Sequence, residues 1–157
     1  MEPARWLTTR EEQAWRLFVA VLMLVPGEVE AQLKRDAGLT QVDYGVLSAL
    51  SEAPGRAMRM NELARMVNGS RPRMSQVVAK LERRGWVRRE PTREDGRGSL
   101  AVLTDAGYAQ VVAIAPGHVA AVREAVVDAL SPEQLDQLAG ISATLLDALE
   151  ARRSGSS

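Results

Sequence analysis

Apolar residues recur at helical spacing along most of this chain. In one basic stretch, Met74, Val77, Val78 and Leu81 fall at i, i+3, i+4 and i+7. This spacing predicts a helix with one buried stripe, and the basic and polar residues between these positions then lie on its exposed side.

Capping signals mark where each helix is expected to begin. The predicted starts are Thr8 or Thr9, Thr40, Asn61, Ser70, Thr104 and Ser131. The corresponding helices end near residues 36, 53, 67, 84, 130 and 151, and glycine follows closely after the first four. Two proline–glycine pairs fall inside the first and fifth helices. We expect a kink or short break at Pro26 and a kink at Pro116.

Two short stretches alternate as strands do. Residues 86–90 and 99–103 place apolar and polar or smaller side chains on opposite faces. The segment between them, residues 91–98, is polar and charged. The pattern therefore predicts a β-hairpin with a long, charged tip.

The predicted elements fall into two modules. Residues 37–104 form a compact lobe, whereas residues 8–36 and 105–153 form long amphipathic helices at the two ends. Such helices carry more apolar surface than a small lobe can cover, and the simplest partner is a second copy in a two-fold dimer. Residues 154–157 are expected to be a disordered tail. The fold class is mainly α with a small β-hairpin.

Charge is sorted along the chain, although the net charge is zero over 157 residues. Residues 71–97 contain nine Lys and Arg against four Asp and Glu, whereas the flanking segments are slightly acidic. A local basic patch of this kind favours a nucleic-acid partner over a generally basic surface.

Several classes of function are excluded by composition. The chain has no cysteine and one histidine, so disulfides, cysteine-bound zinc and a histidine metal cluster within one chain are excluded. It shows no phosphate-cradling glycine loop and no catalytic constellation. We therefore expect no cofactor, no metal and no enzyme activity. The apolar run at residues 17–26 is too short to span a bilayer and resembles no signal peptide, so we expect a cytoplasmic protein that binds no membrane.

The basic helix carries the first candidate contacts to double-stranded DNA. Arg71 and Arg73 could bind guanine edges or phosphates, Ser75 and Gln76 could bind base edges, and Lys80 is better placed for phosphate. The alternative is a solvated helix whose charges only keep the protein soluble. These residues alone favour neither interpretation.

The hairpin tip carries the second set. Arg93 and Arg97 are suited to a narrow, negative minor groove or to backbone phosphates, and Asp95 is placed to hold Arg97. The alternative is a charged loop with no partner. For the remaining arginines we favour a solvated face or contact with the DNA backbone over base recognition. These are Arg83, Arg84, Arg88 and Arg89.

An ordered set of motifs resembles the multiple-antibiotic-resistance regulator (MarR) family. The motifs are NELA at 61–64, LERRG at 81–85, DGRG at 95–98, VLTDAG at 102–107 and LSPEQ at 130–134. In that family, the hairpin, or wing, carries Asp-x-Arg, and Leu-Thr-x-x-Gly follows one strand later. Many relatives have a further Arg or Lys where this chain has Gly96, so the wing tip is less basic here.

The resemblance implies a winged helix-turn-helix with long terminal dimerisation helices. It also implies a homodimeric transcription regulator, usually a repressor that covers a palindromic promoter site. Small aromatic or phenolic effectors bind such proteins between the dimer helices and the lobe and release the DNA. Trp15, Phe18, Tyr44 and Met23 could line such a cleft, although each also fits ordinary core packing. His118 could contact an effector, act as a pH-sensitive group or be purely structural. The competing function is a winged-helix module that binds another protein and no DNA.

Overall fold

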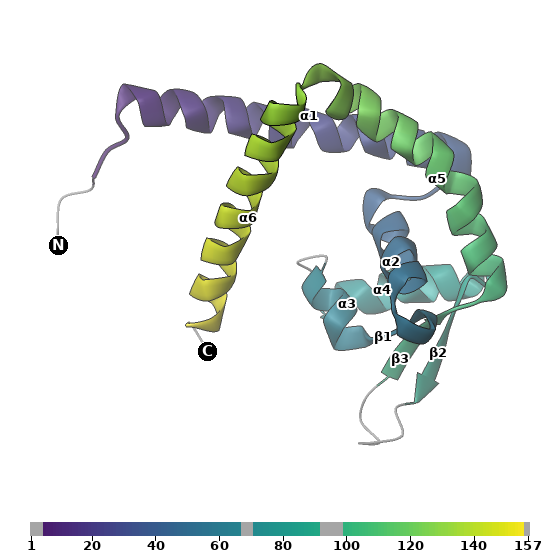
Figure 1. Cartoon of the computed structure of the whole chain (residues 1–157). Coiled ribbons are helices and arrows are strands. Elements are labelled where there is room, and N and C mark those ends of the chain that lie inside the picture. The colour runs from purple at the N-terminus through teal and green to yellow at the C-terminus, as the bar shows by residue number, and fades with distance from the viewer. Residues whose placement is uncertain (1–4, 67–70, 92–98, 156–157) are drawn as a thin grey trace. The chain divides into compact units, whose positions relative to one another are not determined.

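The computed structural model describes residues 5–66, 71–91 and 99–155. Figure 1 shows the order of the elements along the chain. They are α1 (Thr9–Ala37), α2 (Gln41–Glu52), η1 (Pro54–Arg56), β1 (Ala57–Arg59), α3 (Met60–Met66), α4 (Arg71–Arg83), β2 (Val87–Pro91), β3 (Ser99–Leu103), α5 (Asp105–Ala125), η2 (Val127–Ala129) and α6 (Pro132–Ser154). The chain divides into two units, residues 1–121 and 122–157, which are described separately.

Helix α1 begins and ends at capping residues. The Thr8 side chain accepts a hydrogen bond from the Glu11 amide, and the Glu11 carboxylate accepts one from the Thr8 amide. Gly38 ends the helix in the left-handed conformation. Of the kink or short break predicted at Pro26, the break does not occur, because α1 is continuous through this residue. Proline removes one helical hydrogen bond, and the turns on either side keep the helix intact. Helix α5 likewise continues through Pro116.

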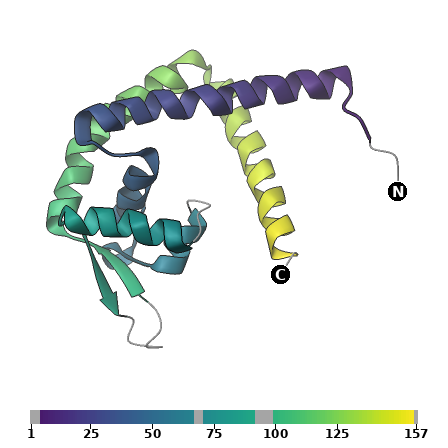
Figure 2. The ribbon, with the colours of Figure 1, turned by 180° about the vertical axis from the view of Figure 1, so that it is seen from behind.

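The core of the first unit is formed mainly by α2, α3, α4 and the strands, and α1 and α5 add Leu33, Val111 and Ile114. Figure 2 shows α4 passing above the strands, with the C-terminal end of α1 over the lobe and its N-terminal half extending beyond it. The largest fully buried side chains are Leu33, Leu39, Leu47, Leu50, Leu63, Met74 and Leu81. The predicted stripe of α4 is confirmed, since Met74, Val78 and Leu81 are buried and Val77 packs against them.

The sheet has three antiparallel strands in the order β1-β3-β2. The predicted hairpin is confirmed, with Val87 opposite Leu103 and Pro91 opposite Ser99. The sheet also contains β1, which the sequence pattern did not predict as a strand. It pairs with β3, with Ala57 opposite Val102, and so adds an edge strand. The hairpin tip lies outside the described residues.

The last strand joins α5 through a tight contact with Trp86. The carbonyl of Trp86 accepts hydrogen bonds from the amide and the hydroxyl of Thr104, at 3.0 and 3.1 Å. The Thr104 hydroxyl oxygen accepts a bond from the amide of Gly107 and so caps α5. A Cβ on Gly107 would lie 2.1 Å from the Trp86 carbonyl oxygen. The Leu-Thr-x-x-Gly motif is therefore a packing motif for the joint between the wing and α5.

The second unit contains the end of α5, η2 and α6. Helix α5 ends at Ala125, earlier than expected, and η2 follows it. Ser131 and Gln134 form the predicted reciprocal cap of α6, which continues to Ser154, into the expected tail. Among the described residues, the segment Asp105–Ala129 is long and apolar enough to cross a membrane. Core helices of soluble proteins also meet these two criteria, so the segment is only weak evidence for a membrane span.

Candidate nucleic-acid interface

The exposed side of α4 carries four of the predicted contact residues. Arg71, Arg73, Ser75 and Gln76 are all exposed and lie on its first two turns. Arg73, Ser75 and Gln76 lie off the buried stripe, because a helix places i, i+3 and i+4 positions on one face. Arg71 lies one turn before Met74, at the exposed N-terminal end of that stripe. The structure therefore presents polar and cationic groups together at the N-terminal half of this helix.

Two arginines of α4 have guanidinium groups that bind no other described residue. Arg71 and Arg83 form no hydrogen bond or ion pair within that part of the chain. Both residues are exposed. They can therefore reach phosphate or base oxygens without first breaking a contact to the described residues.

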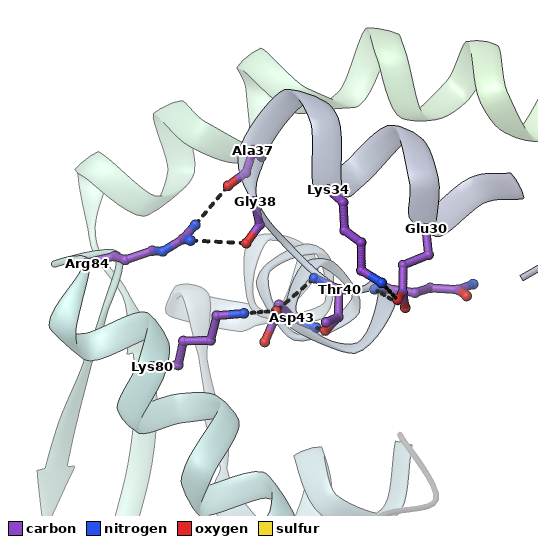
Figure 3. A network of polar contacts seen from close by, with 9 residues as sticks. Glu30, Lys34, Ala37, Gly38, Thr40, Asp43, Lys80 and Arg84 are labelled. Atoms are coloured by element: carbon purple, nitrogen blue, oxygen red, sulfur yellow. Dashed lines mark hydrogen bonds and ion pairs between the residues drawn. The ribbon is translucent and has the colours of Figure 1, made fainter. Parts of the chain in front are cut away.

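Lys80 differs from these residues because it forms an ion pair within the lobe. Its Nζ lies 2.6 Å from Oδ2 of Asp43, whose side chain is only 3% exposed (Figure 3). Asp43 also accepts a hydrogen bond from the Thr40 amide at 2.8 Å and caps α2. Burial raises the pKa of Asp43, but the bonds from Lys80 and Thr40 outweigh it and hold that pKa below its usual value. Lys80, expected at phosphate, is neutralised inside the protein.

Arg84, just after α4, is bonded to the end of α1. Its guanidinium donates to the carbonyl of Ala37 at 2.9 Å and to that of Gly38 at 3.0 Å (Figure 3). The same group lies over the ring of Trp86, 4.8 Å from the centroid. These two carbonyls lie at the end of α1, where backbone acceptors lack helical partners. Arg84 therefore joins α4 to α1.

The arginines of β2 also bind within the protein. Arg89 donates to the carbonyl of Ser75 on α4 at 2.8 Å and pairs with Glu82 at 3.2 Å. Arg88 pairs with Glu90 on its own strand at 2.7 Å. The basic charge of residues 71–97 is therefore only partly presented to solvent, which the sequence count did not show.

The predicted wing contacts lie outside the described residues. These are Arg93, Asp95 and Arg97. The two strands that lead to them are paired throughout, so the ends of the wing are fixed by β2 and β3.

The predicted effector residues form two separate ring contacts. Trp15 and Phe18 lie on the exposed side of α1, with ring centroids 6.5 Å apart. Tyr44 is buried and lies 4.5 Å from the ring of His118 on α5. Met23 is 76% exposed.

A small polar site surrounds the Tyr44–His118 contact. His118 Nδ1 and the side-chain oxygen of Gln32 are buried and have no hydrogen-bond partner among the described residues. The Gln32 amide nitrogen donates to Asp36 at 2.7 Å, and both groups lie against Gly117 of α5. Two unsatisfied polar atoms in one region are unusual, since most buried polar atoms are bonded. The sequence singled out Tyr44 and His118 separately but did not predict their contact or the part of Gln32, because these residues come from α1, α2 and α5.

Burial lowers the pKa of His118 below its ordinary value of 6.5. The unfolded chain then takes up a proton at a higher pH than the folded protein does. We therefore expect the free energy of unfolding to be constant above about pH 7 and to fall as the pH drops below 6.5. Urea unfolding between pH 7.5 and 5 measures this slope. The His118→Gln variant should show a shallower slope over the same range. An equal slope in both proteins would contradict the assignment.

Comparison with known proteins identifies the family. A model of the MarR family matches residues 37–98. The structure is also similar to that of Sco3205, a MarR family transcriptional regulator from Streptomyces coelicolor, crystallised in complex with DNA. The two chains are 45% identical, the match covers 95% of this chain and 93% of Sco3205, and the TM-score is 0.90. The chain belongs to the MarR family of transcriptional regulators.

Further relatives of this MarR-family protein agree. AbsC, a MarR family regulator from Streptomyces coelicolor, is 38% identical over 94% of this chain and 99% of its own, with a TM-score of 0.88. The HTH-type transcriptional regulator YkoM of Bacillus subtilis (strain 168) is 28% identical over 130 residues, which are 82% of this chain and 81% of YkoM. The resemblance and the mainly helical winged-helix fold are thus confirmed.

Proposed function

We propose that this MarR-family protein is a dimeric, sequence-specific DNA-binding regulator that represses transcription from a palindromic promoter site. The observation that carries this proposal is the exposed polar and cationic half of α4, with two guanidinium groups unoccupied among the described residues. Sco3205, which is 45% identical, was crystallised in complex with DNA, and this supports DNA as the partner of the present protein.

In this proposal α4 enters the major groove by its first two turns. Arg71 and Arg73 bind guanine edges or phosphates, and Ser75 and Gln76 bind neighbouring base edges. Arg93 and Arg97 bind in the adjacent minor groove or at phosphates, with Asp95 holding Arg97.

A second copy is expected to cover the exposed apolar residues of both terminal helices. In α1 these include Trp15, Leu17, Val21, Leu22 and Leu24, and in α6 they include Leu138, Ile141, Leu145, Leu146 and Leu149. Apolar surface of this extent is unusual on a monomer. A two-fold dimer would place the two α4 helices on half-sites about 34–36 Å apart, or a multiple of that distance.

Small aromatic effectors are proposed to release the DNA, and the site around Tyr44 and His118 supports this. It offers a buried ring, an unpartnered acceptor on Gln32 and an unpartnered nitrogen on His118. Trp15 and Phe18 would add ring surface only if the second copy brings them to the site. A panel of small phenols can be tested for a rise in melting temperature and for release of DNA. If no phenol produced either change, this effector class would be disproved.

We place the protein in the cytoplasm, where its promoter lies.

Duplex binding and its salt dependence test the function. Sites selected from random DNA should bind the full-length protein, with an affinity that falls steeply with salt. The Arg71→Ala and Arg97→Ala variants should each remove about one phosphate contact per copy or relax base preference, and either loss lowers affinity at fixed salt. Electrophoretic mobility shift at several salt concentrations measures both effects. Equal, salt-insensitive binding to all sequences, or none, would instead favour the protein-binding module.

A further inference from the structure

We propose that Lys80 and Arg84 are positioning residues that set the angle of α4 against α1, and thereby the spacing between half-sites that the dimer accepts. The proposal rests on the DNA-binding function above. It assigns to these two cations a role that differs from contact with DNA.

The first support is where the two cations are bound. Lys80 reaches from α4 to the first turn of α2, and Arg84 reaches from the end of α4 to the last carbonyls of α1. Figure 3 shows both bonds converging on the short junction between α1 and α2. Glu30 of α1 strengthens this junction, because its carboxylate accepts from the Gln41 amide at 3.3 Å and pairs with Lys34 at 2.6 Å.

The second support is the burial of Asp43. Its carboxylate is almost wholly removed from water, and Lys80 is the cation that neutralises it. A buried carboxylate without its partner is strongly unfavourable, so Lys80 cannot leave for a phosphate without a large penalty. The lysine is therefore committed to the lobe when DNA is bound.

The third support is the character of α1. Its exposed apolar residues are the surface proposed for the second copy, and its last turn is what Arg84 holds. Whatever fixes α4 to that turn also fixes where the recognition helix lies in the dimer. Arg84 suits this task because its planar guanidinium binds two carbonyls at once, one from each terminal nitrogen, whereas a lysine ammonium lacks this fixed fork.

The experiment compares three variants of the full-length protein: Lys80→Met, Asp43→Asn with Lys80→Met, and Arg84→Gln. Each is measured on palindromic duplexes whose half-sites are separated by one base pair more or less than in the selected site. We expect Lys80→Met to lower affinity for the best site about tenfold. It should also reduce the difference in affinity between the selected spacing and the altered ones. The double variant should recover much of the affinity, because no charge is left buried, but not the preference for one spacing, because the bond from α4 to α2 is still missing. Arg84→Gln should also reduce the difference in affinity between the selected spacing and the altered ones.

Salt dependence separates positioning from phosphate contact. Log affinity falls linearly with log salt, and the loss of one phosphate contact from each copy makes this negative slope shallower by about 1.8. We expect Lys80→Met and Arg84→Gln to keep the wild-type slope, whereas the control Arg71→Ala should make the slope shallower. A shallower slope in Lys80→Met, with no rescue by Asp43→Asn, would overturn the assignment of Lys80. Arg84→Gln tests the second residue even where Lys80→Met does not fold. A wild-type chain that binds no duplex would instead overturn the proposed function.

Discussion

Replacing Gly107 with alanine is expected to destabilise the protein by about 3 kcal/mol, the upper part of the range for overpacking. The new Cβ would lie 2.1 Å from the Trp86 carbonyl oxygen and 2.8 Å from Cδ1 of Leu103. The leucine could rotate, but the carbonyl is fixed because it accepts the hydrogen bonds of Thr104. Either α5 moves away from the sheet or those bonds break.

Thermal unfolding by circular dichroism measures the effect. A loss of about 3 kcal/mol corresponds to a melting temperature lower by roughly 6–12 °C for a chain of this size. Gly45→Ala is the matched control, since Gly45 lies inside α2 and its Cβ would meet no atom within 4 Å. Alanine is the better helix former, so that variant should melt slightly higher. A Gly107→Ala protein that melts within 1–2 °C of wild type would contradict the proposed joint.

Local signals predicted the elements well. The caps at Thr8, Thr40 and Ser131 were confirmed because an N-cap residue and its partner lie three positions apart in sequence. The strand at residues 99–103 and the buried stripe of α4 were confirmed for the same reason, since period and burial are local properties.

The missed features all depend on residues distant in sequence. Lys80 and Asp43 are 37 positions apart, and Arg84 and Ala37 are 47 apart. A count of charges cannot distinguish an arginine that faces solvent from one that holds a backbone carbonyl. The edge strand β1 was missed as a strand because three residues carry too little alternation to predict a partner. Tyr44 and His118 were each named as candidates, but their contact and the nearby Gln32 were missed, because three helices bring them together.

The arginines and the lysine of residues 71–97 have two different roles in the structure. Among the described residues, some hold α4 in place and others are presented to solvent. Arg84 and Arg89 bind carbonyls and Lys80 binds a carboxylate, whereas Arg71 and Arg83 have no described partner. Several cations of this segment would therefore have to break an internal bond before they could contact DNA, which the count of charges in the sequence does not show.

Placing a charge in the apolar stripe of α6 is expected to abolish the dimer and, with it, most DNA affinity. Leu138, Ile141, Leu145 and Leu149 follow one another at three- and four-residue spacing along one side of this helix, and all are exposed. In the proposed dimer they are covered by the second copy. A Leu145→Asp carboxylate would then be buried without a cation, at a cost that the interface cannot offset.

The mass in solution and the affinity for DNA measure the outcome. Light scattering should give roughly 34 kDa for the wild-type dimer, twice the 17.1 kDa chain, and the single-chain mass for Leu145→Asp. Affinity for a palindromic site should fall about 100-fold or more, because the two lobes no longer bind as one molecule. Ala143→Asp is the matched control, since it adds the same charge on the far side of α6 and should leave a DNA-binding dimer. If Leu145→Asp kept the dimer mass and the wild-type affinity, this stripe would not be the interface, and α4 would have to be positioned in the assembly through α1 alone.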